Sequence, residues 1–124
     1  MATDAPPAPR VALIGCGLVG QKRLNLLPPG SVTVACDLQI DRAQKLAAQS
    51  AGCVATDSIE KALAAPNVDV VMIATVNASL APLAIQAAQA GKHVLVEKPA
   101  AISVRQLDEL EAVATKRGVR VRVG

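Results

Sequence analysis

The stretch Val11–Gly20 constrains the fold of this chain more than any other. Four apolar residues run directly into a Gly-x-Gly-x-x-Gly motif formed by Gly15, Gly17 and Gly20, and a helix-forming segment, Leu18–Leu27, follows at once. In this order Gly15 permits the sharp exit from a strand, Gly17 lets the backbone approach a phosphate, and Gly20 allows close packing of helix on strand. The new helix adds free backbone N–H groups and the positive end of its dipole. The motif alone also fits a purely structural turn.

The rest of the sequence alternates short apolar strands with amphipathic helices. The expected strands are residues 11–14, 32–37, 53–56, 68–74, 93–97 and 119–124. This alternation predicts βαβ units and a parallel sheet. Because crossovers are right-handed, we expect an α/β fold, the doubly wound Rossmann fold, as a single domain over residues 10–124. Its strand order would be 3-2-1-4-5-6, with a ligand crevice at the carboxyl ends of the first and fourth strands.

Local signals predict where several helices begin. Asp57, with Glu60 three residues later, is expected to cap the third helix. Pro82 suits only the first turn of a helix, so the fourth helix is expected to begin at about Ser79. Ser103 is expected to cap the last helix.

Composition excludes several classes of partner. The chain has no Phe, Tyr or Trp, so aromatic stacking on single-stranded nucleic acid is not available. The net charge of +3 is modest and the basic residues are scattered, so no nucleic-acid partner is expected. No segment approaches the ~20 apolar residues of a membrane span. Residues 1–9 are rich in proline without an apolar region, and predict a disordered leader rather than a signal peptide.

The three cysteines, Cys16, Cys36 and Cys53, show no metal-binding spacing, and the chain has one His, so no metal site is expected. An odd number of cysteines without a disulfide pattern suits the reducing cytoplasm, where each would be a small buried apolar residue. Cys16 lies beside a helix N-terminus, which leaves a reactive thiol as the alternative. His93 begins a strand and is expected to be structural.

Asp37 strengthens the case for a nucleotide site. It lies 22 residues after Gly15, at the end of the second expected strand. An acid at this position accepts hydrogen bonds from the ribose hydroxyls of a dinucleotide. Because its carboxylate would repel a 2′-phosphate, NAD is favoured over NADP, although nearby Arg42 keeps NADP open. A strand-end Asp that merely begins a turn is the structural alternative.

A second group of polar residues, Glu97-Lys98-Pro99, follows the fifth expected strand and therefore lies on the same edge of the sheet as the glycine turn. A lysine there can meet the nicotinamide end of a cofactor or the oxygen of a substrate. Beside a carboxylate, its protonation can be tuned for proton transfer. On its own, Glu-Lys-Pro is also a common surface tripeptide.

These motifs together resemble the N-terminal domain of the glucose-fructose oxidoreductase / inositol dehydrogenase (Gfo/Idh/MocA) family. The matching stretches are residues 15–20, Asp37, residues 68–75 and residues 90–99. The resemblance implies an NAD(P)-dependent oxidoreductase acting on sugars, cyclitols or related alcohols, with Lys98 as the catalytic residue. The cofactor-binding residues expected from the motifs and the resemblance are Gly15, Gly17, Leu18, Val19, Gly20, Asp37, Thr75, Asn77, Glu97, Lys98 and Pro99.

The sequence departs from that family in several places. Where the family usually reads Thr-Pro-Asn-x-x-His, Val76 and Leu80 replace the Pro and the His, while Asn77 is retained. Arg23 stands where a His often follows the glycine turn. The resemblance also implies a second α/β domain with the substrate contacts and usually a catalytic His, which this sequence lacks after Gly124. We therefore expect cofactor binding without full catalysis, and a sugar-like substrate only together with a second domain.

Two other functions stay open. The alternating residues Val119, Val121 and Val123 leave one side of the last strand apolar, which suits a stand-alone nucleotide-binding module that forms a homo-oligomer, a dimer, through its open face. A domain that binds coenzyme A or another nucleotide would share the glycine turn. Asp37 disfavours it, because an acid there matches a free ribose diol.

Overall fold

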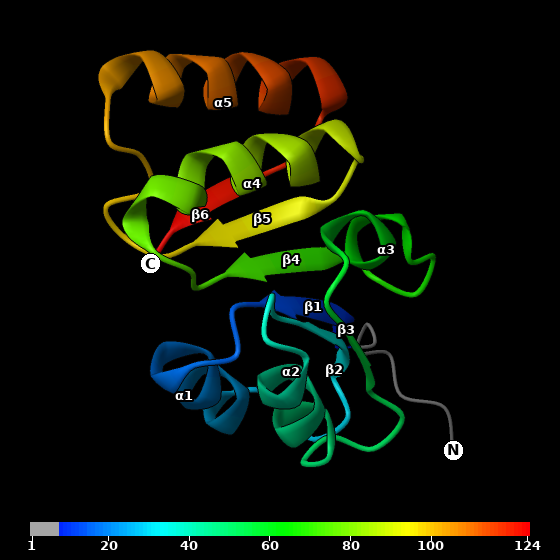
Figure 1. Cartoon of the computed structure of the whole chain (residues 1–124). Coiled ribbons are helices and arrows are strands. Elements are labelled where there is room, and N and C mark those ends of the chain that lie inside the picture. The colour runs from blue at the N-terminus through cyan, green and yellow to red at the C-terminus, as the bar shows by residue number, and fades with distance from the viewer. Residues whose placement is uncertain (1–7) are drawn as a thin grey trace.

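Strands and helices alternate along residues 8–124, the part of the chain that the computed structural model describes (Figure 1). The strands are β1 (Val11–Ile14), β2 (Val32–Cys36), β3 (Val54–Thr56), β4 (Val70–Ile73), β5 (His93–Val96) and β6 (Val121–Val123). The helices are α1 (Leu18–Leu26), α2 (Ile40–Ala47), α3 (Ile59–Ala64), α4 (Asn77–Gln89) and α5 (Val104–Arg117). Most of the predicted leader, residues 1–7, lies outside the described residues, and Ala8 and Pro9 have no regular structure.

The strands form one parallel sheet in the order β3-β2-β1-β4-β5-β6, which confirms the predicted doubly wound topology. At the centre of the sheet, Ile14 at the end of β1 lies between Cys36 of β2 and Ile73 of β4. The strand order reverses between β1 and β4. In open α/β sheets the ligand crevice forms at this point, outside the carboxyl ends of the strands.

Helices cover both faces of the sheet and give the domain two apolar cores. Ala12 and Ile14 of β1 face the core beneath α3, α4 and α5, while Val11 and Leu13 face the core beneath α1 and α2. A strand buried on both faces reads as a continuous apolar run, which explains the sequence of β1. In the absence of aromatic side chains, buried alanines of α4 let this helix pack closely on the sheet.

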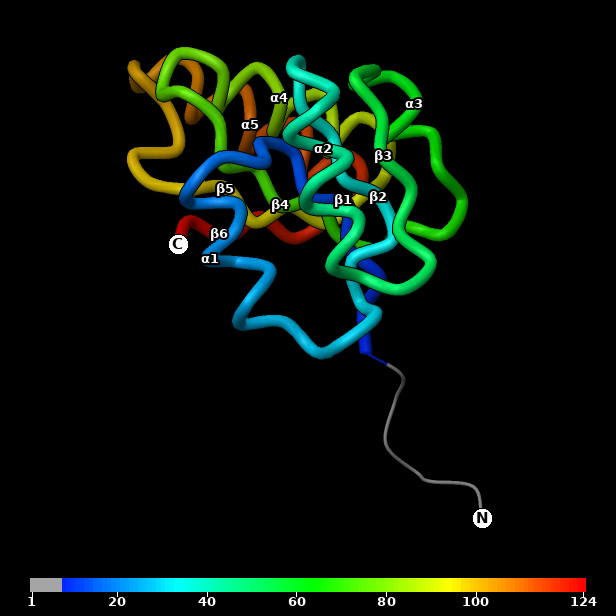
Figure 2. The backbone as a smooth tube through the Cα atoms, turned by 60° about the horizontal axis from the view of Figure 1, so that its bottom comes forward, coloured from blue at the N-terminus to red at the C-terminus, as the bar shows by residue number. Residues whose placement is uncertain are grey.

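One half of one face has no helix over it among the described residues. Helices α1 and α2 lie beside β1, β2 and β3, whereas α4 and α5 lie beside β5 and β6 on the other face (Figure 1). The uncovered half consists of half-buried Val70, Met72 and Leu95 and is bordered by Arg120 and Arg122. The end of β6 lies beside α1 (Figure 2), where a Cβ on Gly124 would be 3.7 Å from the guanidinium of Arg23.

Two of the predicted helix starts are wrong. Ser58, not Asp57, caps α3, and its side chain accepts a hydrogen bond from the N–H of Lys61. Helix α4 begins at Asn77, two residues before the expected start, so Pro82 lies inside it. Only one short turn precedes the proline, and the N–H that Pro82 lacks would have bonded one carbonyl of that turn. The cap of α5 is confirmed, since the Ser103 hydroxyl accepts from the N–H of Gln106.

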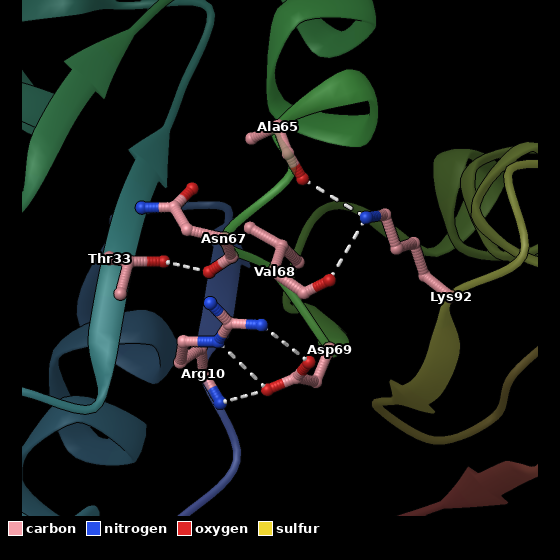
Figure 3. Close-up of polar contacts among 7 residues, drawn as sticks. All are labelled: Arg10, Thr33, Ala65, Asn67, Val68, Asp69 and Lys92. Atoms are coloured by element: carbon pink, nitrogen blue, oxygen red, sulfur yellow. Dashed lines mark hydrogen bonds and ion pairs between the residues drawn. The ribbon is translucent and has the colours of Figure 1, made fainter.

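Polar side chains tie the loops together at the edge where the strands begin (Figure 3). The Arg10 guanidinium, just before β1, donates to both carboxylate oxygens of Asp69, just before β4, at 3.1 and 3.2 Å. The Lys92 ammonium, just before β5, donates to the carbonyls of Ala65 and Val68 at 3.0 and 2.9 Å. These contacts hold the loop between α3 and β4 at the edge of the sheet opposite to the glycine turn.

Candidate functional site: a crevice at the carboxyl edge of the sheet

The backbone at Gly15 has a conformation that only glycine accommodates here. Its φ is +97°, and a Cβ at this position would lie 2.5 Å from the carbonyl oxygen of Ala74. The N–H of Gly15 donates to the carbonyl of Cys36 at 2.8 Å, which joins the turn to the end of β2. The chain therefore leaves β1 in close contact with the ends of both neighbouring strands.

The other two glycines of the motif differ in their surroundings. A Cβ on Gly20, in the first turn of α1, would lie 2.0 Å from the carbonyl oxygen of Gly15, so α1 sits directly on the turn. Gly17 is the N-cap of α1, and the position of its missing Cβ has one neighbour within 4 Å, the Arg42 Nη1 at 3.9 Å. Gly20 thus fixes the helix, while Gly17 leaves free space in front of the helix N-terminus.

That space belongs to a cavity of about 640 Å³ at the carboxyl edge of the sheet. It lies among the segments that follow β1, β2 and β4. The predicted site residues that line it are Gly15, Gly17, Leu18, Val19, Asp37 and Thr75. The cavity therefore coincides with the predicted switch-point crevice, and its floor is the glycine turn.

Asp37 is held in place by the backbone on both sides of the cavity. One carboxylate oxygen accepts from the N–H of Cys16 at 2.8 Å, and the other accepts from the N–H of Gln39 at 2.8 Å. An ionised carboxylate offers about four acceptor positions, so both oxygens can still accept from a ligand hydroxyl. The side chain is thereby oriented before any ligand arrives.

Sequence reasoning missed the apolar walls of the cavity. Leu38 and Val76 line it and are 84% and 73% exposed, and Ile59, Pro82 and Leu83 also belong to its apolar lining. Large aliphatic residues in the loops that follow strand ends were the available signal. Such side chains can cover the faces of a purine base in a protein that has no aromatic residues.

The thiol of Cys16 is packed inward rather than toward the cavity. Its Sγ donates to the carbonyl of Cys36 at 3.4 Å, and burial raises the pKa of the Cys16 thiol to about 12. Since the thiolate is the reactive form, the alternative of a reactive thiol is wrong. Among residues 8–124, no group of three His, Cys, Asp or Glu side chains could hold a metal ion.

The Glu97-Lys98-Pro99 segment follows β5 at the carboxyl edge of the sheet but does not line the cavity. Two other predicted site residues, Gly20 and Asn77, do not line it either. The Glu97 carboxylate is half-buried and accepts from the Arg23 Nε of α1 at 2.5 Å. Sequence reasoning did not find this ion pair, although Arg23 was noted as a departure from the family pattern. The Lys98 side chain is exposed and has no hydrogen-bond or ion-pair partner within the described part of the chain.

The turn that presents Lys98 is fixed by its own backbone. Ala100 has a φ of +69° and is 1% exposed, so its methyl group is packed in the core despite a left-handed conformation. Such a residue costs of order 1–3 kcal/mol and persists only where its surroundings impose it. The N–H of Ala100 donates to the Glu97 carbonyl at 3.0 Å, and the Lys98 N–H donates to the carbonyl of Gly124, the residue after β6, at 3.2 Å.

A glycine turn at a helix N-terminus, an oriented acid at the next strand end and a crevice at the switch point define a dinucleotide-binding domain of the Rossmann class. The comparison with protein families agrees. Residues 9–124 match the family described as "Oxidoreductase family, NAD-binding Rossmann fold". The chain belongs to this family, which confirms the predicted fold, cofactor class and resemblance.

Its relatives include dehydrogenases and reductases from actinomycetes. Inositol 2-dehydrogenase 4 of Saccharopolyspora erythraea is 37% identical over 120 residues, which cover 90% of this chain and 35% of the relative. The dTDP-3,4-didehydro-2,6-dideoxy-alpha-D-glucose 3-reductase of Streptomyces violaceoruber is 30% identical over 122 residues, which cover 94% of this chain and 35% of the relative. The chain thus spans about a third of the length of these relatives.

Solved structures show the same fold with a bound dinucleotide. GenD2 from gentamicin A biosynthesis, in complex with NAD, has a TM-score of 0.85 and 31% identity over 100% of this chain and 37% of its own. KijD10, a 3-ketoreductase from Actinomadura kijaniata in complex with NADP and TDP-benzene, has a TM-score of 0.85 and 28% identity. The match covers 95% of this chain and 37% of KijD10. Within residues 8–124, none of the helices has the length and apolar character needed to cross a membrane.

Proposed function

We propose that this domain binds NAD in the crevice at the carboxyl edge of its sheet. The observation that carries the proposal is the preoriented Asp37 carboxylate beside the glycine turn, in one cavity. The N–H groups of Leu18 and Val19, at the start of α1, face the diphosphate, and Asp37 accepts from the adenosine ribose hydroxyls. Leu38 and Val76 cover the adenine.

NAD is the preferred dinucleotide in this proposal. The Asp37 carboxylate lies where a 2′-phosphate would enter, and two negative charges at such a distance repel each other. The NAD complex of GenD2 and the NADP complex of KijD10 show that similar domains hold either cofactor. The preference of this chain therefore depends on its own residues at the ribose.

We further propose that the domain serves an oxidoreductase acting on a sugar, a cyclitol or a related alcohol. When bound, a nicotinamide cofactor supplies the hydride acceptor. Lys98, on its fixed turn, would hold the substrate hydroxyl and take its proton, while Thr75, Asn77, Glu97 and Pro99 would position the nicotinamide. The names of the relatives support this class of substrate. Because the chain spans a third of their length, the substrate contacts are expected from a second domain.

The cofactor proposal is tested by calorimetric titration with NAD and NADP. We expect NAD to bind more tightly than NADP, and Asp37→Ala to weaken NAD binding by about tenfold or more, since it removes a charged hydrogen-bond acceptor. The matched control is Asp41→Ala on the neighbouring helix, an exposed acid that does not line the cavity. No binding of either dinucleotide would refute the proposal. We expect no dehydrogenase activity with myo-inositol for the chain alone.

The uncovered half of the sheet favours one alternative function, that of a nucleotide-binding module that dimerises through this face. Val70, Met72 and Leu95 supply an apolar surface, but a two-fold pair that buries it would hold Arg120 and Arg122 of both copies in or beside the interface. Like charges at an interface oppose association. Sedimentation velocity with and without NAD distinguishes the two functions, because only the module requires a dimer.

The three free cysteines support a cytoplasmic location for both proposed functions.

A further inference from the structure

We propose that Arg42 is a diphosphate-binding residue of the crevice, an inference that rests on the proposed binding of a dinucleotide there. Arg42 lies in the first turn of α2, on the wall of the cavity opposite to α1. Its Nη1 atom is 3.9 Å from the point where a Cβ of Gly17 would lie. The guanidinium therefore reaches from α2 to the middle glycine of the turn.

The Arg42 guanidinium has no partner of its own within the described part of the chain. The ion pairs there join Arg10 to Asp69 and Arg23 to Glu97, and the Arg42 side chain makes no hydrogen bond. Asp37 lines the same cavity, yet its two oxygens accept from backbone N–H groups rather than from Arg42. A planar group with five N–H donors is thus available to a ligand.

The direction of the open space at Gly17 identifies which part of a dinucleotide this group meets. Glycine at this position lets a diphosphate approach the backbone through the volume that a side chain would fill. An anion in that volume lies between the N-terminal N–H groups of α1 and Arg42 Nη1. The helix terminus contributes about half a positive charge, and the guanidinium contributes a full one. Together they offset most of the two negative charges of a diphosphate, which the helix terminus alone does not.

This geometry gives Arg42 a different role from the one its sequence position indicates. Its proximity to Asp37 in the sequence suits a group that binds a 2′-phosphate and admits NADP. A 2′-phosphate would lie at the ribose, beside the Asp37 carboxylate, whereas the Arg42 guanidinium extends toward the open volume at Gly17, 3.9 Å from the position that a Cβ there would take. Arg42 should therefore stabilise NAD and NADP equally, because both carry the same diphosphate.

The experiment compares Arg42→Ala with Arg105→Ala by calorimetric titration of NAD, NADP, ADP and AMP. Arg105 is the matched control, an exposed arginine in the first turn of α5 that does not line the cavity. Charged hydrogen bonds are worth enough to predict a loss of about 10- to 100-fold for NAD, NADP and ADP in Arg42→Ala. AMP, which lacks the diphosphate, should lose less. Arg105→Ala should bind all four ligands like the wild type.

Circular dichroism confirms that each variant is folded, and Arg42→Lys, which keeps the charge without the planar fork, should fall between wild type and Arg42→Ala. Unchanged binding of NAD and ADP by Arg42→Ala would overturn the role of Arg42 and leave the cofactor site standing. A loss confined to NADP would also overturn it, because it would show a 2′-phosphate contact. If the wild type binds none of the four ligands, the cofactor site itself fails and this inference fails with it.

Discussion

The two edges of the sheet differ in how many of their cationic side chains have a partner. At the edge where the strands begin, Arg10 and Lys92 donate to a carboxylate and to two loop carbonyls (Figure 3). At the edge where the strands end, Arg42 and Lys98 have no such partners within the described part of the chain. The first edge uses its cations to hold the fold. At the second edge Arg23 pairs with Glu97, but Arg42 and Lys98 stay available to a ligand.

The carboxyl edge is itself divided. One part of it has a cavity with an oriented acid, Asp37. In the other part, Lys98 lies outside the lining of that cavity, and the neighbouring acid, Glu97, is bound to Arg23. The carboxyl edge therefore combines a cavity that holds an oriented acid with an exposed lysine outside that cavity. In the function proposed above, the cavity takes the adenosine half of the dinucleotide and Lys98 meets its reactive end.

The largest effect is expected at the glycine turn of the carboxyl edge, where α1 packs directly on the backbone of the turn. Gly20→Ala would place a Cβ against the Gly15 carbonyl, and we expect it to lower the free energy of unfolding by about 3 kcal/mol or more. The control is Gly52→Ala, whose φ of +77° is strained but whose surroundings are empty within 4 Å, and which should cost about 1 kcal/mol. Urea unfolding measures both. Equal losses would show that close packing does not set the cost at Gly20.

At the amino edge, Lys92→Met should lower the free energy of unfolding by about 2 kcal/mol, because the carbonyls of Ala65 and Val68 lose a charged donor. The affinity for NAD should stay unchanged, since Lys92 lies at the opposite edge of the sheet. Urea unfolding and calorimetric titration provide the two measurements. A large loss of affinity with little loss of stability would reverse the assignment of the two edges.

At the carboxyl edge, Lys98→Met is the matched substitution with the opposite expected outcome. The exposed side chain makes no hydrogen bond within residues 8–124, so stability should change by less than about 0.5 kcal/mol. If Lys98 meets the nicotinamide end, NAD should bind several-fold more weakly while ADP binds as before. Equal changes for NAD and ADP would place Lys98 elsewhere.

The sequence predicts the fold well, because strand and helix periods, glycine turns and crossover handedness together allow one topology. The order of all six strands and the edge that carries the crevice follow from these local features. Helix starts were less predictable: Ser58 and Asp57 can both act as caps, and only the backbone geometry decides between them.

The long-range contacts of the site could not be predicted. The Arg23–Glu97 pair joins residues 74 positions apart, and the position of the Arg42 guanidinium in front of Gly17 depends on how α2 packs beside the turn. A spacing rule places a residue at the end of a strand, as it did for Asp37. It does not say which way a long side chain from a neighbouring helix extends.

The smallest expected effect is electrostatic and lies at the amino edge. The Arg10 guanidinium and N–H lower the pKa of the Asp69 carboxyl from 3.8 to about 2. Because the pKa is lowered in the folded state, the pair contributes stability above about pH 4 and loses it as the pH falls toward 2. Both side chains are about half exposed, so salt screens the pair and its contribution is small.

Asp69→Asn should make the urea midpoint fall less steeply between pH 4 and pH 2 than in the wild type. Glu60→Gln, which removes an exposed acid without an ion-pair partner in residues 8–124, should leave more of that slope in place. Equal slopes in both variants would show that the carboxylate of Asp69 does not depend on Arg10.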